Sequence, residues 1–102
     1  WMFQKASEPN PIDLVGAMAI IEGLGQRVAG RWADAIQAQL GLRDDQLRFL
    51  RHHAAADEGH LDALWSLVES LDLPASRIES IVSCARVTAR LYRLQLEEIG
   101  NR

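Results

Sequence analysis

The sequence has little cysteine, no long hydrophobic run and no excess of basic charge. Its single cysteine, Cys84, excludes an internal disulfide framework and fits a reducing compartment, so we expect a cytoplasmic protein. The longest apolar stretch, residues 14–21, is too short to span a bilayer, and no signal-peptide pattern opens the sequence. With a net charge of −3 and both signs interspersed, we expect neither nucleic acid nor membrane among its partners.

The sequence also lacks a strand pattern, an internal repeat and a low-complexity segment. Its 102 residues are 48% hydrophobic and 25% charged, which is ordinary for one small globular domain. Trp1 precedes Met2, whereas an open reading frame would begin with Met. We therefore expect residues 1–102 to form one all-helical domain that is part of a longer protein.

Three long helices account for nearly all of the sequence, at residues 10–40, 44–71 and 76–99. Pro11 fits the first position of the first helix, and Gly41 fits the end of that helix. Ser76 and Glu79 form the pattern of a capping box at the start of the third helix. Because the connections are short, the expected fold is all-α, with three long antiparallel helices forming at least part of a bundle.

The second helix carries three candidate metal ligands, His53, Asp57 and His60, whose spacing places them on one face. Apolar residues continue this face in both directions: Phe49, Leu50, Leu64, Leu67, Val68 and Leu71. We therefore expect the face to point into the core, where a lone carboxylate is costly and a bound cation reverses that cost. Each residue alone could be an ordinary hydrogen-bonded or ion-paired side chain, but the three together favour a metal site.

Glu22 is the only charged residue between positions 14 and 26, and it shares its side of the first helix with apolar residues. Alone, it could equally be a glutamate that reaches solvent at the edge of a helix. Gly23 and Gly25 favour a function, because glycine inside a helix costs up to about 1 kcal/mol relative to alanine. The two glycines indicate either a close approach to the backbone or a bend.

Imidazole nitrogen and carboxylate oxygen, without thiolate, suit iron or manganese with open coordination positions, and also zinc. Helical bundles build dinuclear carboxylate sites from such side chains. Cys84 has no adjacent base in the sequence, so we interpret it as a packed thiol and not as a nucleophile. No catalytic residue is predicted beyond the metal ligands, and His52 and Glu58, which lie off the ligand face, are expected to be solvated.

Residues 10–25 and 49–60 resemble the glutamate helix and the His-x3-Asp-x2-His helix of the haem-oxygenase-like iron-containing redox enzymes, the haem-oxygenase-like diiron oxidases and oxygenases. The resemblance implies a larger helical bundle, of which residues 1–102 are the C-terminal half, and which uses two irons and dioxygen to oxidise a small organic substrate. It implies that Glu22 bridges the irons, that Asp57 and His60 bind one of them, and that His53 binds the other. A further glutamate and histidine of the family have no counterpart here, so an upstream segment, a homodimer or another partner chain would complete the site, unless the site is mononuclear.

The expected substrate pocket is apolar, with five residues that we predict to line it: Met18, Ile21, Phe49, Leu64 and Tyr92. They indicate an apolar or amphipathic molecule and nothing more specific. Two alternatives remain open. One is a metal-free enzyme of the same fold, similar to thiaminase-II-like or pyrroloquinoline-quinone-synthase-like proteins, and the other is a non-catalytic helical interaction module.

Overall fold

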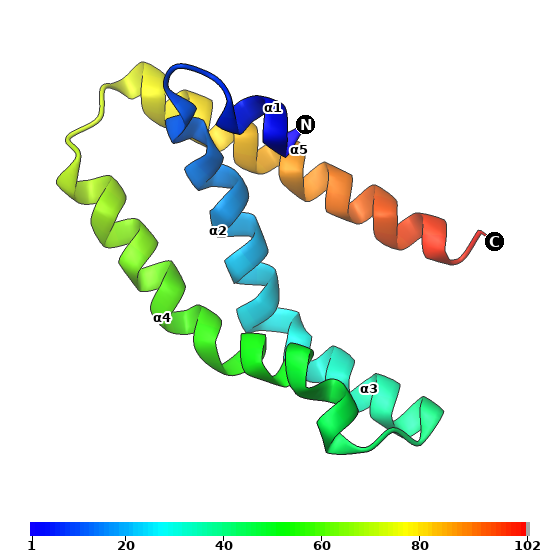
Figure 1. Cartoon of the computed structure of the whole chain (residues 1–102). Coiled ribbons are helices and arrows are strands. Elements are labelled where there is room, and N and C mark those ends of the chain that lie inside the picture. Colours follow the sequence, from blue (N-terminus) through cyan, green and yellow to red (C-terminus); the bar gives the residue numbers. More distant parts are fainter. Residues whose placement is uncertain (102) are drawn as a thin grey trace. The chain divides into compact units, whose positions relative to one another are not determined.

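The computed structural model describes residues 1–101, apart from the side chains of residues 57 and 58. Eight helical segments follow one another along the chain (Figure 1): α1 (Met2–Ala6), η1 (Pro11–Asp13), α2 (Leu14–Leu24), η2 (Gly25–Ala29), α3 (Gly30–Leu40), η3 (Asp44–Leu47), α4 (Arg48–Ser70) and α5 (Ala75–Ile99). No strand occurs among the described residues, and the all-α class is confirmed. No helix in this part of the chain is both long and apolar enough to cross a membrane.

The first predicted helix is present from Pro11 to Leu40, but it is not uniform. A 3-10 turn, η1, opens it, and a π-helical segment, η2, separates α2 from α3. Gly41 ends it as predicted, with a φ of 62° and its N–H donating to the carbonyl oxygen of Gln37 at 2.9 Å. The short helix α1 was not predicted, because the first residues show no helical period.

The capping box predicted at Ser76 is wrong. Helix α5 begins at Ala75, its N-cap is Pro74, and no side chain caps it. The carbonyl oxygen of Pro74 accepts the N–H of Arg77 at 2.8 Å, so the helix starts one residue earlier than the pattern indicates. Ser76 therefore lies inside the first turn, where its carbonyl oxygen accepts the hydroxyl of Ser80 at 3.0 Å.

The chain forms two compact units, and the first contains residues 1–20 and 68–102. Its centre is a close crossing of α2 and α5 at Gly16. A Cβ atom on Gly16 would overlap the carbonyl oxygen of Ile81 and lie 2.8 Å from the amide nitrogen of Ala85. Ala17, Ile81 and Cys84 are buried around this crossing. Glycine is required here because the backbones are too close for any side chain.

The second unit contains residues 21–67, in which α3 and the first half of α4 lie side by side and antiparallel (Figure 1). The guanidinium of Arg51 contacts Asp34 at 3.1 Å. One turn further along each helix, a Cβ atom on Gly30 would lie 3.6 Å from the Cβ atom of Ala54, an ordinary contact distance. Because residue numbers rise on one helix as they fall on the other, these contacts define the register of the pair.

The apolar face of α4 is less buried than expected. Leu64 is 8% exposed, but Phe49 is 73%, Leu67 49% and Leu71 44% exposed. A chain of this length has a large surface relative to its volume, so it cannot cover a helix of 23 residues along a whole face. The sequence period correctly predicts the helix but overestimates how much of it is covered.

The two glycines of α2 should respond oppositely to alanine. Gly16→Ala should destabilise the fold by about 1–3 kcal/mol, because its methyl group overlaps the backbone of α5. Gly23→Ala should stabilise it by about 0.5–1 kcal/mol, because nothing described lies within 4 Å of the added atom. Urea unfolding followed by circular dichroism measures both, and equal effects would contradict the close crossing.

Candidate metal centre

Helix α4 fixes the spacing of the three candidate ligands that it carries. It is continuous from Arg48 to Ser70, so His53, Asp57 and His60 share one face, as predicted. The His53 ring is half-buried and lies 4.5 Å from the ring of Phe49, centroid to centroid. The side chain of Asp57 lies outside the described residues, as does that of Glu58.

Glu22, near the end of α2, and His60, in α4, contact each other within the second unit. The Oε2 atom of Glu22 lies 3.0 Å from Nδ1 of His60, although the residues are 38 positions apart in the sequence. The side chain of Glu22 is 24% exposed and that of His60 is 58% exposed. The structure therefore brings together two of the four predicted ligands, one from each motif.

The π-helical segment η2 begins three residues after Glu22, at Gly25. Such segments are rare, and they often occur beside functional sites. No described atom lies within 4 Å of a Cβ built on Gly23, so a close approach to that glycine is not seen in this part of the chain. For Gly23, the structure supports the explanation by an irregular helix.

The contact between Glu22 and His60 fits a shared metal ion. Two neighbouring ligands of one octahedral ion, each bonded at about 2.1 Å, lie about 3 Å from each other. The observed 3.0 Å is compatible with that separation, and it is equally an ordinary hydrogen-bond length. Within the described residues, no group of three or more potential ligands is close enough to hold an ion, so His53 is not gathered with this pair.

A comparison with models of protein families identifies the family of this chain. The model of a family described as iron-containing redox enzymes matches residues 2–100. The chain belongs to this family. No curated protein and no solved structure matches it significantly. Membership supports a redox role for the chain and iron as its metal.

The five residues predicted to line a substrate pocket differ widely in burial. Leu64 is buried, Ile21 and Tyr92 are half-buried, and Met18 and Phe49 are 46% and 73% exposed. Met18 and Tyr92 belong to the first compact unit, and the other three belong to the second. Their role as a substrate pocket remains a prediction.

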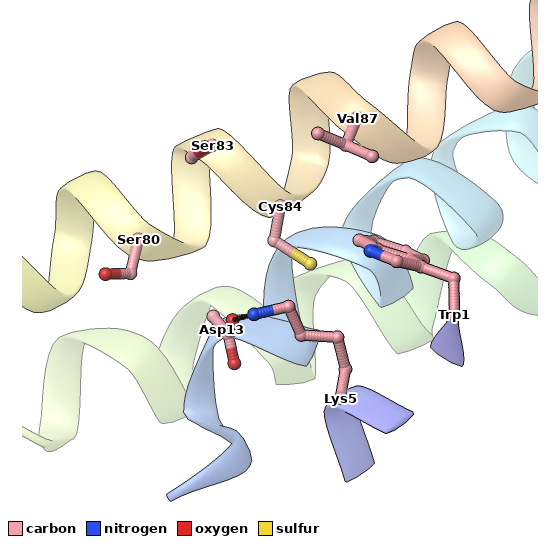
Figure 2. A pocket seen from close by; sticks show the side chains of 7 residues that line it. All are labelled: Trp1, Lys5, Asp13, Ser80, Ser83, Cys84 and Val87. Atoms are coloured by element: carbon pink, nitrogen blue, oxygen red, sulfur yellow. Dashed lines mark ion pairs between the residues drawn. The ribbon is translucent and has the colours of Figure 1, made fainter. Parts of the chain in front are cut away.

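The sequence analysis missed an ion pair between Lys5 and Asp13. Their Nζ and Oδ2 atoms are 2.8 Å apart, and Asp13 is only 8% exposed. Figure 2 shows both side chains beneath Cys84, at the edge of a cavity of about 220 Å³ in the first unit. An aspartate in the first helical turn is usually a capping residue, which is why the sequence did not indicate a buried pair.

Cys84 is a free and buried cysteine, which agrees with its interpretation as a packed thiol. Burial raises the pKa of its thiol, and a hydrogen bond from the Ala17 N–H opposes this only in part. A buried thiol with a raised pKa forms little thiolate at neutral pH. This agrees with the absence of thiol chemistry from the predicted site.

Alkylation should show that the Cys84 thiol is protected. Iodoacetamide should react more slowly with the folded protein than with the unfolded one. In the folded protein, the alkylation rate should rise with pH, with a midpoint above the pKa that the Cys84 thiol has in the unfolded chain. Because the folded pKa is the higher one, stability should fall as pH rises from the unfolded toward the folded pKa. Cys84→Ala should lack that fall, and equal alkylation rates in both states would contradict the protection.

Proposed function

We propose that this chain binds iron through Glu22, His53, Asp57 and His60, and that it acts as a non-haem iron oxidase or oxygenase on a small organic substrate. The observation that carries the proposal is the 3.0 Å contact between Glu22 and His60. It joins the glutamate of the first motif to the last histidine of the second. The match to the iron-containing redox family supports iron over manganese or zinc.

The four donors are chemically suited to iron. Imidazole and carboxylate are of hard to intermediate character, and an ion held by two or three of these side chains keeps coordination positions open. When bound, iron supplies the redox chemistry, since it changes oxidation state and can activate dioxygen. A dinuclear form, with Glu22 between two ions, needs two further ligands, which a second copy of the chain or another segment would supply.

Glu22 and His60 also hold a proton between them when no metal is bound. Without metal, Glu22 and His60 share a hydrogen bond, with Nδ1–H of the imidazole donating to the carboxylate. This bond keeps both groups near the positions that they need as ligands. If Nδ1 is the ligating atom, its proton moves to Nε2 before the metal binds; an imidazolium has no free nitrogen to offer, so iron affinity should rise with pH.

Removing a ligand should abolish tight iron binding. Asp57→Ala and His60→Ala should each weaken anaerobic Fe²⁺ binding, measured by calorimetry, by at least about 100-fold. His52→Ala is the matched control, because His52 is an exposed histidine on the same helix outside the predicted ligand set. If all variants bind iron as the parent does, the ligand assignment is wrong; if the folded parent takes up no iron, a metal-free relative or an interaction module replaces the proposal.

Glu22 should act as a ligand and not only as a hydrogen-bond partner of His60. Glu22→Gln keeps an oxygen that can accept the imidazole N–H but removes the negative charge. Its Fe²⁺ affinity should therefore fall about as far as that of Glu22→Ala. Near-normal iron binding by Glu22→Gln, with loss only in Glu22→Ala, would show instead that Glu22 orients His60 from outside the metal's coordination sphere.

A further inference from the structure

Arg51 is the centre of a polar network at the end of the second unit where α3 turns into α4. Its Nη1 lies 3.1 Å from Oδ1 of Asp34, and its Nη2 lies 2.7 Å from Oε1 of Gln37. The same Nη2 lies 3.6 Å from Oδ1 of Asp44, in η3. One guanidinium therefore joins α3, η3 and α4.

Gln37 extends this network through its amide group. Its Nε2 donates to Oδ1 of Asp44 at 2.9 Å and to the carbonyl oxygen of Leu42 at 3.2 Å. The network thereby includes the connection that follows Gly41. A planar guanidinium with several fixed donors defines direction as well as distance, which a single ammonium group does not.

The network contributes more to alignment than to stability. Asp34 and Asp44 have side chains that are 71% and 82% exposed, and exposed ion pairs add little to stability. Arg51 is less exposed, and its Nε atom is shielded from solvent. Nearer the candidate metal centre, the helices touch through Gly30 and Ala54, whose small size gives little resistance to sliding.

The register matters because His60 lies on α4, whereas Glu22 lies near the end of α2, which continues into α3 through the π-helical segment η2. His60 is nine residues beyond Arg51, or about 13.5 Å along α4. A slip of one helical turn would move it by about 5.4 Å relative to Glu22. That shift exceeds the 3.0 Å contact between the two side chains, so the contact exists only in the observed register.

We propose that Arg51 is a positioning residue that sets the register of α4 against α3 and thereby places His60 opposite Glu22. The inference deepens the proposed function and, where it concerns metal affinity, rests on it. The alignment itself can be tested without metal.

A disulfide can report the register directly. The Gly30 and Ala54 Cβ positions are 3.6 Å apart, within the range that a disulfide spans. In a Cys84→Ala background, Gly30→Cys with Ala54→Cys should therefore oxidise readily. Arg51→Asp should slow this oxidation, because it places like charges beside Asp34 and Asp44, and adding Asp34→Arg should restore it. An oxidation rate independent of Arg51 would overturn the proposal.

Metal binding provides the second readout. Arg51→Asp should weaken Co²⁺ binding about tenfold and shift the visible absorption spectrum of the bound ion, and adding Asp34→Arg should reverse both effects. Arg48→Ala, at an exposed arginine of the same helix, is the control and should change neither. A lower melting temperature with an unchanged spectrum would show that Arg51 is merely structural and would overturn the proposal. If the parent protein binds no Co²⁺ but the disulfide result holds, the proposed function fails while the role of Arg51 in alignment stands.

Discussion

The antiparallel register of residues 21–40 against 48–67 is the constraint on which the candidate metal centre depends. Each motif by itself places chemically suitable side chains on a helix, but neither motif makes a site alone. Glu22 meets His60 only because Gly30 faces Ala54 and Asp34 faces Arg51 further along the same pair of helices. The chemistry of the centre is therefore tied to the packing of small residues and to one polar network at the helical turn.

Two carboxylates of this chain illustrate different ways to accommodate a charge away from water. Asp13 is almost fully buried, and its Oδ2 atom forms an ion pair with Lys5 of the same unit, whereas its Oδ1 atom has no hydrogen-bond partner among the described residues. Glu22 is half-buried and faces an imidazole, which compensates its charge only when protonated. A metal ion compensates it at any pH at which the ligands are deprotonated. This difference explains why Glu22, and not Asp13, is the better candidate for chemistry.

The sequence predicts the long helices well and their surroundings less well. Hydrophobic period and helix-terminating residues locate the end of the first predicted helix at Gly41 and the start of the second at Asp44, because glycine and aspartate act through their immediate neighbours. The prediction at Ser76 is wrong, because α5 begins one residue earlier, at Ala75, and its N-cap is Pro74. The π-helical segment and the burial of Asp13 could not be predicted, because they depend on contacts with other segments. The same limit applies to the candidate centre: spacing predicts His53 and His60 on one face, but only tertiary structure shows that His60 meets Glu22.

Binding a metal and using it are separate demands on this chain. Four donors of the right kind are enough for binding, but oxidation chemistry on an organic molecule also requires that bulk water be kept from the reacting atoms. The side chain of His60 is 58% exposed, and Phe49, on the ligand-bearing side of α4, is 73% exposed. A site with these exposures can take up iron, yet it does not by itself provide a dry pocket. Proposed catalysis therefore requires that this face of α4 be covered in the working enzyme, and whatever covers it is also well placed to supply the ligands that a second iron needs.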